Sequence, residues 1–91
     1  MNKIKAKKRK SIIMVIWKDA AYSNQRRLPK KIPSDEITFG VFINETKKAV
    51  NVCMNAHIEN KKIVGCSDGF LIPKKVVKKI KVLGTLDDYE V

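Results

Sequence analysis

Long hydrophobic runs are absent from this sequence of 91 residues. The longest apolar stretch, residues 12–17, is far shorter than the roughly 18 residues that a membrane-spanning helix needs. It is also shorter than the apolar segment of about 7–15 residues in a secretory signal peptide, and no small-residue cleavage site follows it. We therefore expect a single small domain that has no membrane partner and acts in the cytoplasm.

Cysteine and histidine are scarce, with two Cys and one His. Two cysteines fit free thiols in a reducing compartment better than a small secreted scaffold held together by several disulfides. Cys53, His57 and Cys66 have the spacing C-x3-H-x8-C, which supplies only three zinc ligands and lacks a C-x-x-C pair. We expect buried or half-buried thiols and no metal. A structural zinc and a Cys53–Cys66 disulfide are the less favoured alternatives.

Residue groups that carry out catalysis are also missing. The single His57 and the isolated Ser67-Asp68 pair do not make up a nucleophile, a base and an orienting group, and there is no Gly-rich phosphate loop. The tripeptide at residues 67–69 instead predicts a turn, because Asp-Gly suits positions with positive φ. We expect a protein that is not an enzyme and uses no cofactor.

Negative charge is in short supply, because nine Asp and Glu face 20 Lys and Arg and the formal net charge is +11. Residues 1–10 contain six basic residues and no acidic one, whereas residues 85–91 have a charge of −3. Residues 11–84 keep 14 basic and 6 acidic residues, a net of +8. Because like charges repel and stay solvated, we predict a flexible basic arm over 1–10, a domain over 11–84 and a flexible acidic tail over 85–91.

Apolar residues make up 44% of the chain, which is enough for one small core. Strand-forming residues concentrate in five segments separated by turn signals: 11–17, 37–43, 49–55, 70–72 and 76–83. The last segment also fits a short amphipathic helix, and residues 18–36 form a long loop that contains two prolines. The pattern predicts an all-β fold, a small five-stranded SH3-like barrel, with an α+β sheet as the alternative. Its predicted core consists of Ile13, Val15, Trp17, Phe39, Val41, Val50, Val52, Leu71, Ile72 and Val77.

Three short motifs resemble those of a set of small phage and prophage proteins. They are V-x-W-x-D-A at residues 15–20, T-x-G at residues 38–40, and I-P-K at residues 72–74 with Ile80 following. The chain departs from that family's pattern at Thr38, where the family has Ser, while Tyr22 stands in for a second loop aromatic. The resemblance covers residues 12–83. It implies an SH3-like barrel of phage origin and supplies no catalytic residues.

Basic residues are the candidates for binding an anion, because each Lys or Arg that neutralises a phosphate releases a counterion. The adjacent Arg26 and Arg27 add forked guanidinium groups that suit phosphate. The anion-binding candidates are Lys7, Lys8, Arg9, Lys10, Lys18, Arg26, Arg27, Lys30, Lys31, Lys74 and Lys75. Aromatic residues are only 7% of the chain, and the candidates for stacking on bases are Trp17, Tyr22 and Phe42. The alternatives are that the lysines mark solvated turns and that the rings belong to the core.

These observations favour a non-enzymatic, phage-encoded binding protein that engages nucleic acid, or another phosphate-bearing ligand, through its basic loop and arm. Two alternatives remain open. One is an inhibitor or adaptor that docks on a host protein, and the other is a homo-oligomeric sponge that captures a nucleotide signal between protomers. Salt separates them, because only binding through many phosphate contacts weakens steeply as ionic strength rises.

Overall fold

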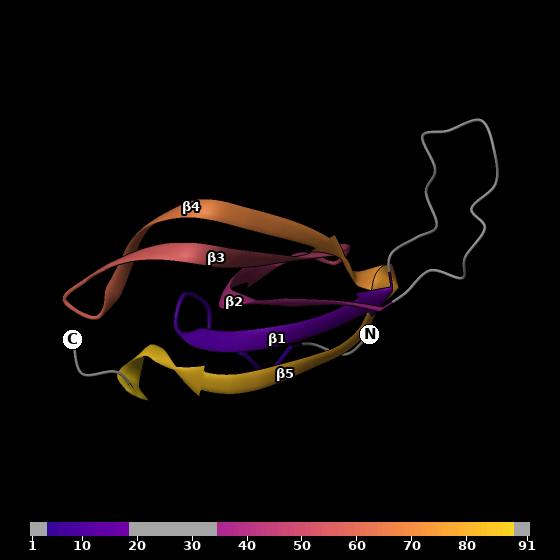
Figure 1. Ribbon diagram of the computed structural model, residues 1–91, viewed down its shortest axis with the longest axis horizontal. Helices are drawn as coiled ribbons and strands as arrows, with labels where there is room; N and C mark the ends of the chain where they lie inside the picture. The colour runs from indigo at the N-terminus through magenta and orange to yellow at the C-terminus, as the bar shows by residue number, and fades with distance from the viewer. Residues whose placement is uncertain (1–3, 19–34, 89–91) are drawn as a thin grey trace.

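The computed structural model describes residues 4–18 and 35–88. This part of the chain forms one antiparallel sheet in the order β4-β3-β2-β1-β5 (Figure 1). The prediction of an all-β protein is confirmed for the described residues, and the C-terminal segment is a strand rather than an amphipathic helix. The strands are β1 (Ser11–Lys18), β2 (Asp35–Glu45), β3 (Ala49–Glu59), β4 (Lys62–Pro73) and β5 (Val77–Thr85). The 3-10 turns η1 (Lys74–Val76) and η2 (Leu86–Asp88) flank β5.

A bend in β2 joins the two halves of the sheet. Residues 35–41 of β2 pair with β1, while the pairing with β3 begins at Val41 opposite Cys53. A Cβ at Gly40 would lie 2.5 Å from the carbonyl oxygen of Cys53, so only glycine allows β3 to cross this closely. Figure 1 shows the result, with β3 and β4 on one side, β1 and β5 on the other, and β2 between them.

The first core lies on one face of this bent sheet and agrees largely with the prediction. Its fully buried members are Ile13, Val15, Phe42, Val50, Val52 and Ile72. Trp17 and Phe70 pack against this core, and their two rings contact each other edge to face with centroids 5.5 Å apart. The indole N–H of Trp17 donates a hydrogen bond to Thr38 Oγ1 at 3.0 Å. Such pairs fix the ring orientation as well as burying apolar area.

Two predicted core residues are wrong. Phe39 is 55% exposed and Leu71 is 61% exposed, while their neighbours Phe42 and Ile72 are buried. Side chains alternate across a strand, so residues an odd number of positions apart point to opposite faces. Once Phe42 and Ile72 enter the first core, Phe39 and Leu71 must therefore face outward.

A second, smaller core lies on the other face and uses residues beyond the predicted domain boundary. Val41 and Ile63 pack there with Leu86 of η2, which is 5% exposed. The backbone N–H of Leu86 donates to the carbonyl of Lys10 at 3.0 Å. Residues 85–88 therefore belong to the folded unit, in contrast to the flexible tail predicted from residue 85, and residues 89–91 lie outside the described part.

The N-terminal segment also differs from the flexible arm that was predicted. Ile4 and Ala6 pack against the first core. The N–H of Lys7 donates to the Ser11 hydroxyl at 2.8 Å, and the N–H of Arg9 donates to the carbonyl of Phe42 at 2.6 Å. Residues 4–10 are thus held against the sheet by apolar contacts and backbone hydrogen bonds.

Strands β3 and β4 form a long hairpin in which two further expectations fail. β4 continues through residues 67–69 without the predicted turn, and the irregularity falls instead in the register around Asn55. Cys53 and Cys66 form a disulfide across the two strands, so the expected thiols are absent. Their separation of 13 residues gave no sign of this closeness, because it depends on the β3–β4 register. Within residues 4–18 and 35–88, no helix has the length and apolar character to cross a membrane.

Candidate anion-binding cleft and adjoining apolar pocket

A basic cleft forms where the turn before β1 meets the tip of the β3–β4 hairpin. We call it the basic cleft; its volume is about 470 Å³. Two segments some 50 residues apart in sequence supply its basic side chains. The cleft is lined by Lys8, Arg9, Lys10, Asn60, Lys61, Lys62, Ile63 and Asp87.

Backbone geometry sets both walls of the basic cleft. Arg9 has φ 57°, and its N–H is anchored to the carbonyl of Phe42. At the hairpin tip, Asn60 and Lys61 have φ 51° and 63°, the pair of positive values that a two-residue type I′ turn requires. The strands next to each turn are paired in the sheet. The basic side chains of both turns are therefore held by ordered backbone rather than by a flexible tail.

The electrostatics of the basic cleft are strongly one-sided. Five basic side chains line it and one acidic side chain, Asp87, joins them. Asp87 Oδ2 lies 3.1 Å from Lys10 Nζ, so it neutralises one cation. The other four, Lys8, Arg9, Lys61 and Lys62, have no ion-pair partner within the described residues. Clustered cations in a concave surface raise the local potential and attract polyanions.

A second basic surface lies at the opposite end of the molecule, beside η1 (Figure 1). Its lysines are Lys47, Lys48, Lys74 and Lys75. Lys74 differs from the others, because its Nζ lies 2.9 Å from Glu45 Oε2 and both side chains are about 15% exposed or less. That carboxylate oxygen is buried and accepts no well-directed hydrogen bond from the described residues, so the contact is mainly electrostatic. Lys74 thus compensates a buried carboxylate rather than presenting a charge to a ligand.

The remaining predicted site residues are placed in three ways. Lys7 and Lys18 are exposed but do not line the basic cleft, and Lys18 lies opposite Asp35 at the other end of β1. Phe42 is 2% exposed and Trp17 is partly buried and hydrogen-bonded, so the stacking role predicted for Phe42 is wrong. Tyr22, Arg26, Arg27, Lys30 and Lys31 lie outside the described residues.

Lys61 and Lys62 are the cleft residues that the sequence did not reveal. They lie at the tip of the hairpin, where β3 ends at Glu59 and β4 begins at Lys62. Nothing local to that segment indicates that it meets residues 8–10, because the approach depends on the curvature of the sheet. The signal available was the pair of lysines at a hairpin tip, which is equally typical of a solvated turn.

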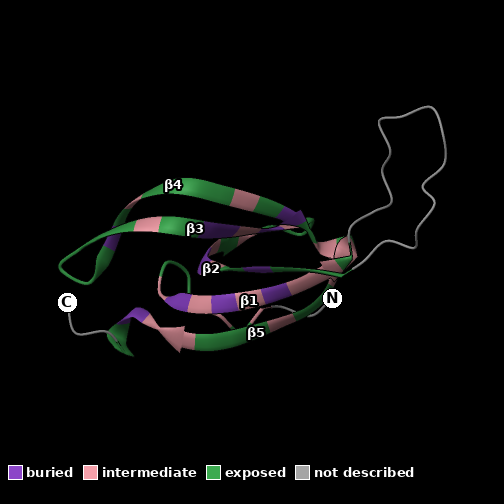
Figure 2. Ribbon diagram, viewed as in Figure 1, coloured by how far each residue is buried: buried purple, intermediate pink, exposed green. Residues whose placement is uncertain are grey.

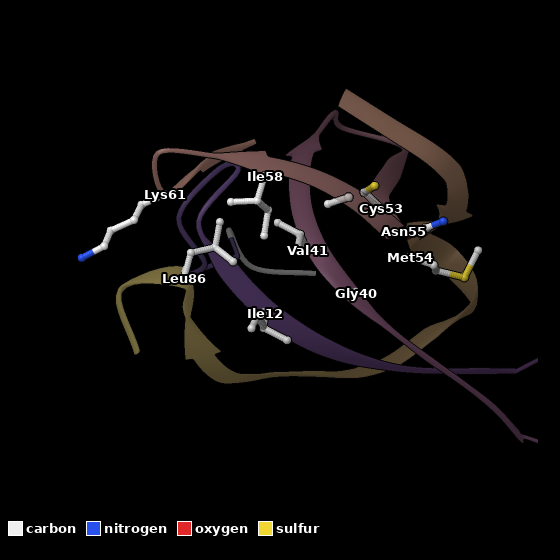
Figure 3. Close-up of a pocket in the computed structure, with 10 residues that line it drawn as sticks. Ile12, Gly40, Val41, Cys53, Met54, Asn55, Ile58, Lys61 and Leu86 are labelled. Carbon is white, nitrogen blue, oxygen red and sulfur yellow. The ribbon is translucent and has the colours of Figure 1, made fainter. Parts of the chain in front are cut away.

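An apolar pocket of about 420 Å³ adjoins the basic cleft. Figure 3 shows the residues that line this pocket. Its deep wall includes Val41 and Leu86, which are 8% and 5% exposed, and its rim includes Met54 and Ile58, which are 49% and 38% exposed. Lys61 lines both the pocket and the basic cleft. The full lining consists of Ile12, Gly40, Val41, Cys53, Met54, Asn55, Ala56, Ile58, Lys61 and Leu86.

An exposed apolar stripe leads away from this pocket along the same face of β1 and β2. Ile12 pairs with Val41 in the pocket wall, and the next pairs on this face are Met14 with Phe39 and then Ile16 with Ile37. Phe39 and Ile37 are 55% and 56% exposed. In Figure 2, β2 carries exposed segments, and β1 beside it alternates between buried and intermediate residues. Contiguous exposed apolar surface of this kind is typical of a binding face.

No known protein family, curated protein or solved structure matches this chain. Its function must therefore be inferred from the chemistry of its own surface. That chemistry combines a group of cations that have no ion-pair partner in residues 4–18 and 35–88 with an apolar pocket that shares one lysine with them.

Among the described residues, the other side chains that could act in catalysis or bind a metal do not form a site. His57 Nε2 and Ser67 Oγ are 2.6 Å apart on the exposed hairpin, without a third group that would orient the imidazole among the described residues. Cys53 and Cys66 are bonded to each other and so cannot bind zinc as thiolates. No cluster of three His, Cys, Asp or Glu side chains occurs within 4–18 and 35–88.

Proposed function

We propose that the protein binds nucleic acid in the basic cleft, as a binding protein without catalytic activity. The observation that carries this proposal is the convergence of Lys8, Arg9, Lys61 and Lys62, none of which has an ion-pair partner in the described part of the chain. Leaving four like charges close together costs free energy through repulsion, and a polyanion relieves that repulsion. Phosphate groups spaced along a backbone are the ligand that best satisfies several cations arranged along one groove.

The salt dependence of binding tests this proposal. Fluorescence anisotropy with labelled single-stranded and duplex oligonucleotides of DNA and RNA would be measured from 50 to 200 mM salt. Four phosphate contacts on a single strand predict a loss of affinity of about 50-fold over this range. Absence of binding to all four nucleic acids at 50 mM salt would contradict the proposal.

A protein partner is the second candidate, and the exposed Ile37 and Phe39 favour it. Docking of a host protein on this apolar stripe would be only weakly salt-dependent, because hydrophobic burial does not release counterions. The nucleotide sponge also predicts weak salt dependence and in addition requires protomers to meet. A single monomeric species in sedimentation, combined with steep salt dependence, excludes the sponge.

We also propose that the sheet closes into a small barrel of the SH3-like kind. The strand order β4-β3-β2-β1-β5, the bend at Gly40 and the 3-10 turn η1 before the last strand support this. The motif resemblance to small phage and prophage proteins leads us to propose a phage origin, and a nucleic-acid partner fits the cytoplasm. In a reducing cytoplasm the Cys53–Cys66 bond would be open to reduction.

A further inference from the structure

Building on the proposed function, we infer that the nucleic acid is single-stranded, with one unstacked base in the apolar pocket and its flanking phosphates in the basic cleft. The two sites share Lys61, so one ligand can occupy both. A ligand that fills them needs anionic groups joined directly to a compact, largely apolar group. A nucleotide within a flexible strand meets this requirement, whereas the bases of a duplex are paired and stacked out of reach.

The pocket has the chemistry that a base requires. Ile12, Val41 and Leu86 provide apolar surface for the faces of the ring, and the pocket volume of about 420 Å³ lies within the range of roughly 300–1,000 Å³ typical of small-molecule sites. Asn55 on the rim supplies an amide, which both donates and accepts hydrogen bonds. An Asn amide can hydrogen-bond to the donor and acceptor groups that every unpaired base carries on its edge, so it suits a base without selecting one.

Phe39 extends the site to a second base. It lies two residues from Val41 along β2, on the same face, so the two backbone positions are about 7 Å apart along the strand. More than half of its surface is exposed, and it belongs to the contiguous apolar stripe on this face of β1 and β2. Bases stack on exposed aromatic rings whatever their sequence, which fits a neighbour of the pocketed nucleotide.

Abasic DNA provides the direct test, because it keeps every phosphate and removes only the bases. Anisotropy would be measured for one 12-nucleotide strand, its fully abasic counterpart and the corresponding duplex. We expect the intact strand to bind at least about fivefold more tightly than the abasic strand, as stacking of even one base implies. We also expect it to bind more tightly than the duplex, despite the higher charge density of the duplex.

Substitutions in the pocket and the stripe complete the test. Phe39→Ala and Met54→Gln should each weaken binding of the intact strand about fivefold or more and leave the abasic strand unchanged. Val64→Ala is the matched control, because Val64 is 58% exposed and does not line the pocket. Equal affinity for intact, abasic and duplex DNA would overturn the inference while leaving the proposed function in place. Failure of all three to bind at 50 mM salt would remove both.

Discussion

The backbone of Cys53 crosses Gly40 so closely that a Cβ at residue 40 would lie 2.5 Å from the Cys53 carbonyl oxygen and 2.6 Å from a methyl group of Val52. This crossing is the point at which β2 leaves β1 as its main partner and pairs with β3. It sets the curvature that places the β3–β4 hairpin over the second core, where Ile63 and Leu86 pack. The position of the basic cleft at the tip of that hairpin therefore depends on this contact.

Gly40→Ala is expected to destabilise the protein by about 2–3 kcal/mol, because the new methyl group overlaps backbone that cannot rotate away. Urea unfolding followed by tryptophan fluorescence of Trp17 would measure the change. Gly69→Ala is the matched control, since a Cβ there would meet its nearest neighbours at 3.9 Å, an ordinary contact distance. A control variant as unstable as Gly40→Ala would show that the close crossing is not the cause.

Lys74→Gln is expected to destabilise the fold by about 1–3 kcal/mol, because it leaves the poorly exposed carboxylate of Glu45 without its counter-charge. The double variant Glu45→Gln/Lys74→Gln should recover part of that loss, since it removes both charges together. Urea unfolding of the two single variants and the double variant gives the coupling energy. Strictly additive effects would mean that the two side chains do not interact.

Reduction of the Cys53–Cys66 disulfide is expected to lower the free energy of unfolding by about 2–3 kcal/mol, since the bond closes a loop in the unfolded chain between cysteines 13 positions apart. Unfolding curves with and without reductant would measure the loss. The variant Cys53→Ala/Cys66→Ser should not respond to reductant; alanine is chosen at position 53 because that side chain is 1% exposed. If alkylation of the denatured wild type without reductant labelled two free thiols, that result would contradict the Cys53–Cys66 bond.

The sequence predicts the fold class well because strand formation depends on local patterns. β-branched runs and turn residues locate all five strands, and alternation identifies buried residues such as Ile13, Val15 and Val52. Strand ends are less accurate, as β4 begins at Lys62 rather than near Phe70. Gly65 and the Ser-Asp-Gly run at residues 67–69 are typical of turns, yet pairing with β3 holds them in the strand. Phe39 was predicted to be in the core and Phe42 to be available for stacking, which is the reverse of what the structure shows. Both faces of β2 carry apolar residues, so the sequence pattern alone does not tell which face is covered by the larger core.

The candidate site could be predicted only in part. Lys8, Arg9 and Lys10 stand out as a run of basic residues, but their partners Lys61 and Lys62 lie some 50 positions away. That contact arises from sheet curvature, and no local signal encodes it. The apolar pocket was missed for the same reason, because β1, β2, β3, the hairpin tip and η2 each contribute to its lining.

The central claim is that nucleic acid binds at the basic cleft rather than through overall charge, and two charge-matched variants test it. Lys61→Gln/Lys62→Gln removes two cations from the basic cleft, and Lys47→Gln/Lys75→Gln removes two exposed cations from the opposite end of the molecule. Both have the same net charge, so any difference between them reflects location.

The deciding measurement is the slope of the logarithm of the association constant against the logarithm of salt concentration for a single-stranded oligonucleotide. Four phosphate contacts predict a wild-type slope of about −2.8, falling in magnitude to about −1.4 in Lys61→Gln/Lys62→Gln and staying near −2.8 in Lys47→Gln/Lys75→Gln. Equal slopes in the two double variants would show that the basic cleft is not the binding site.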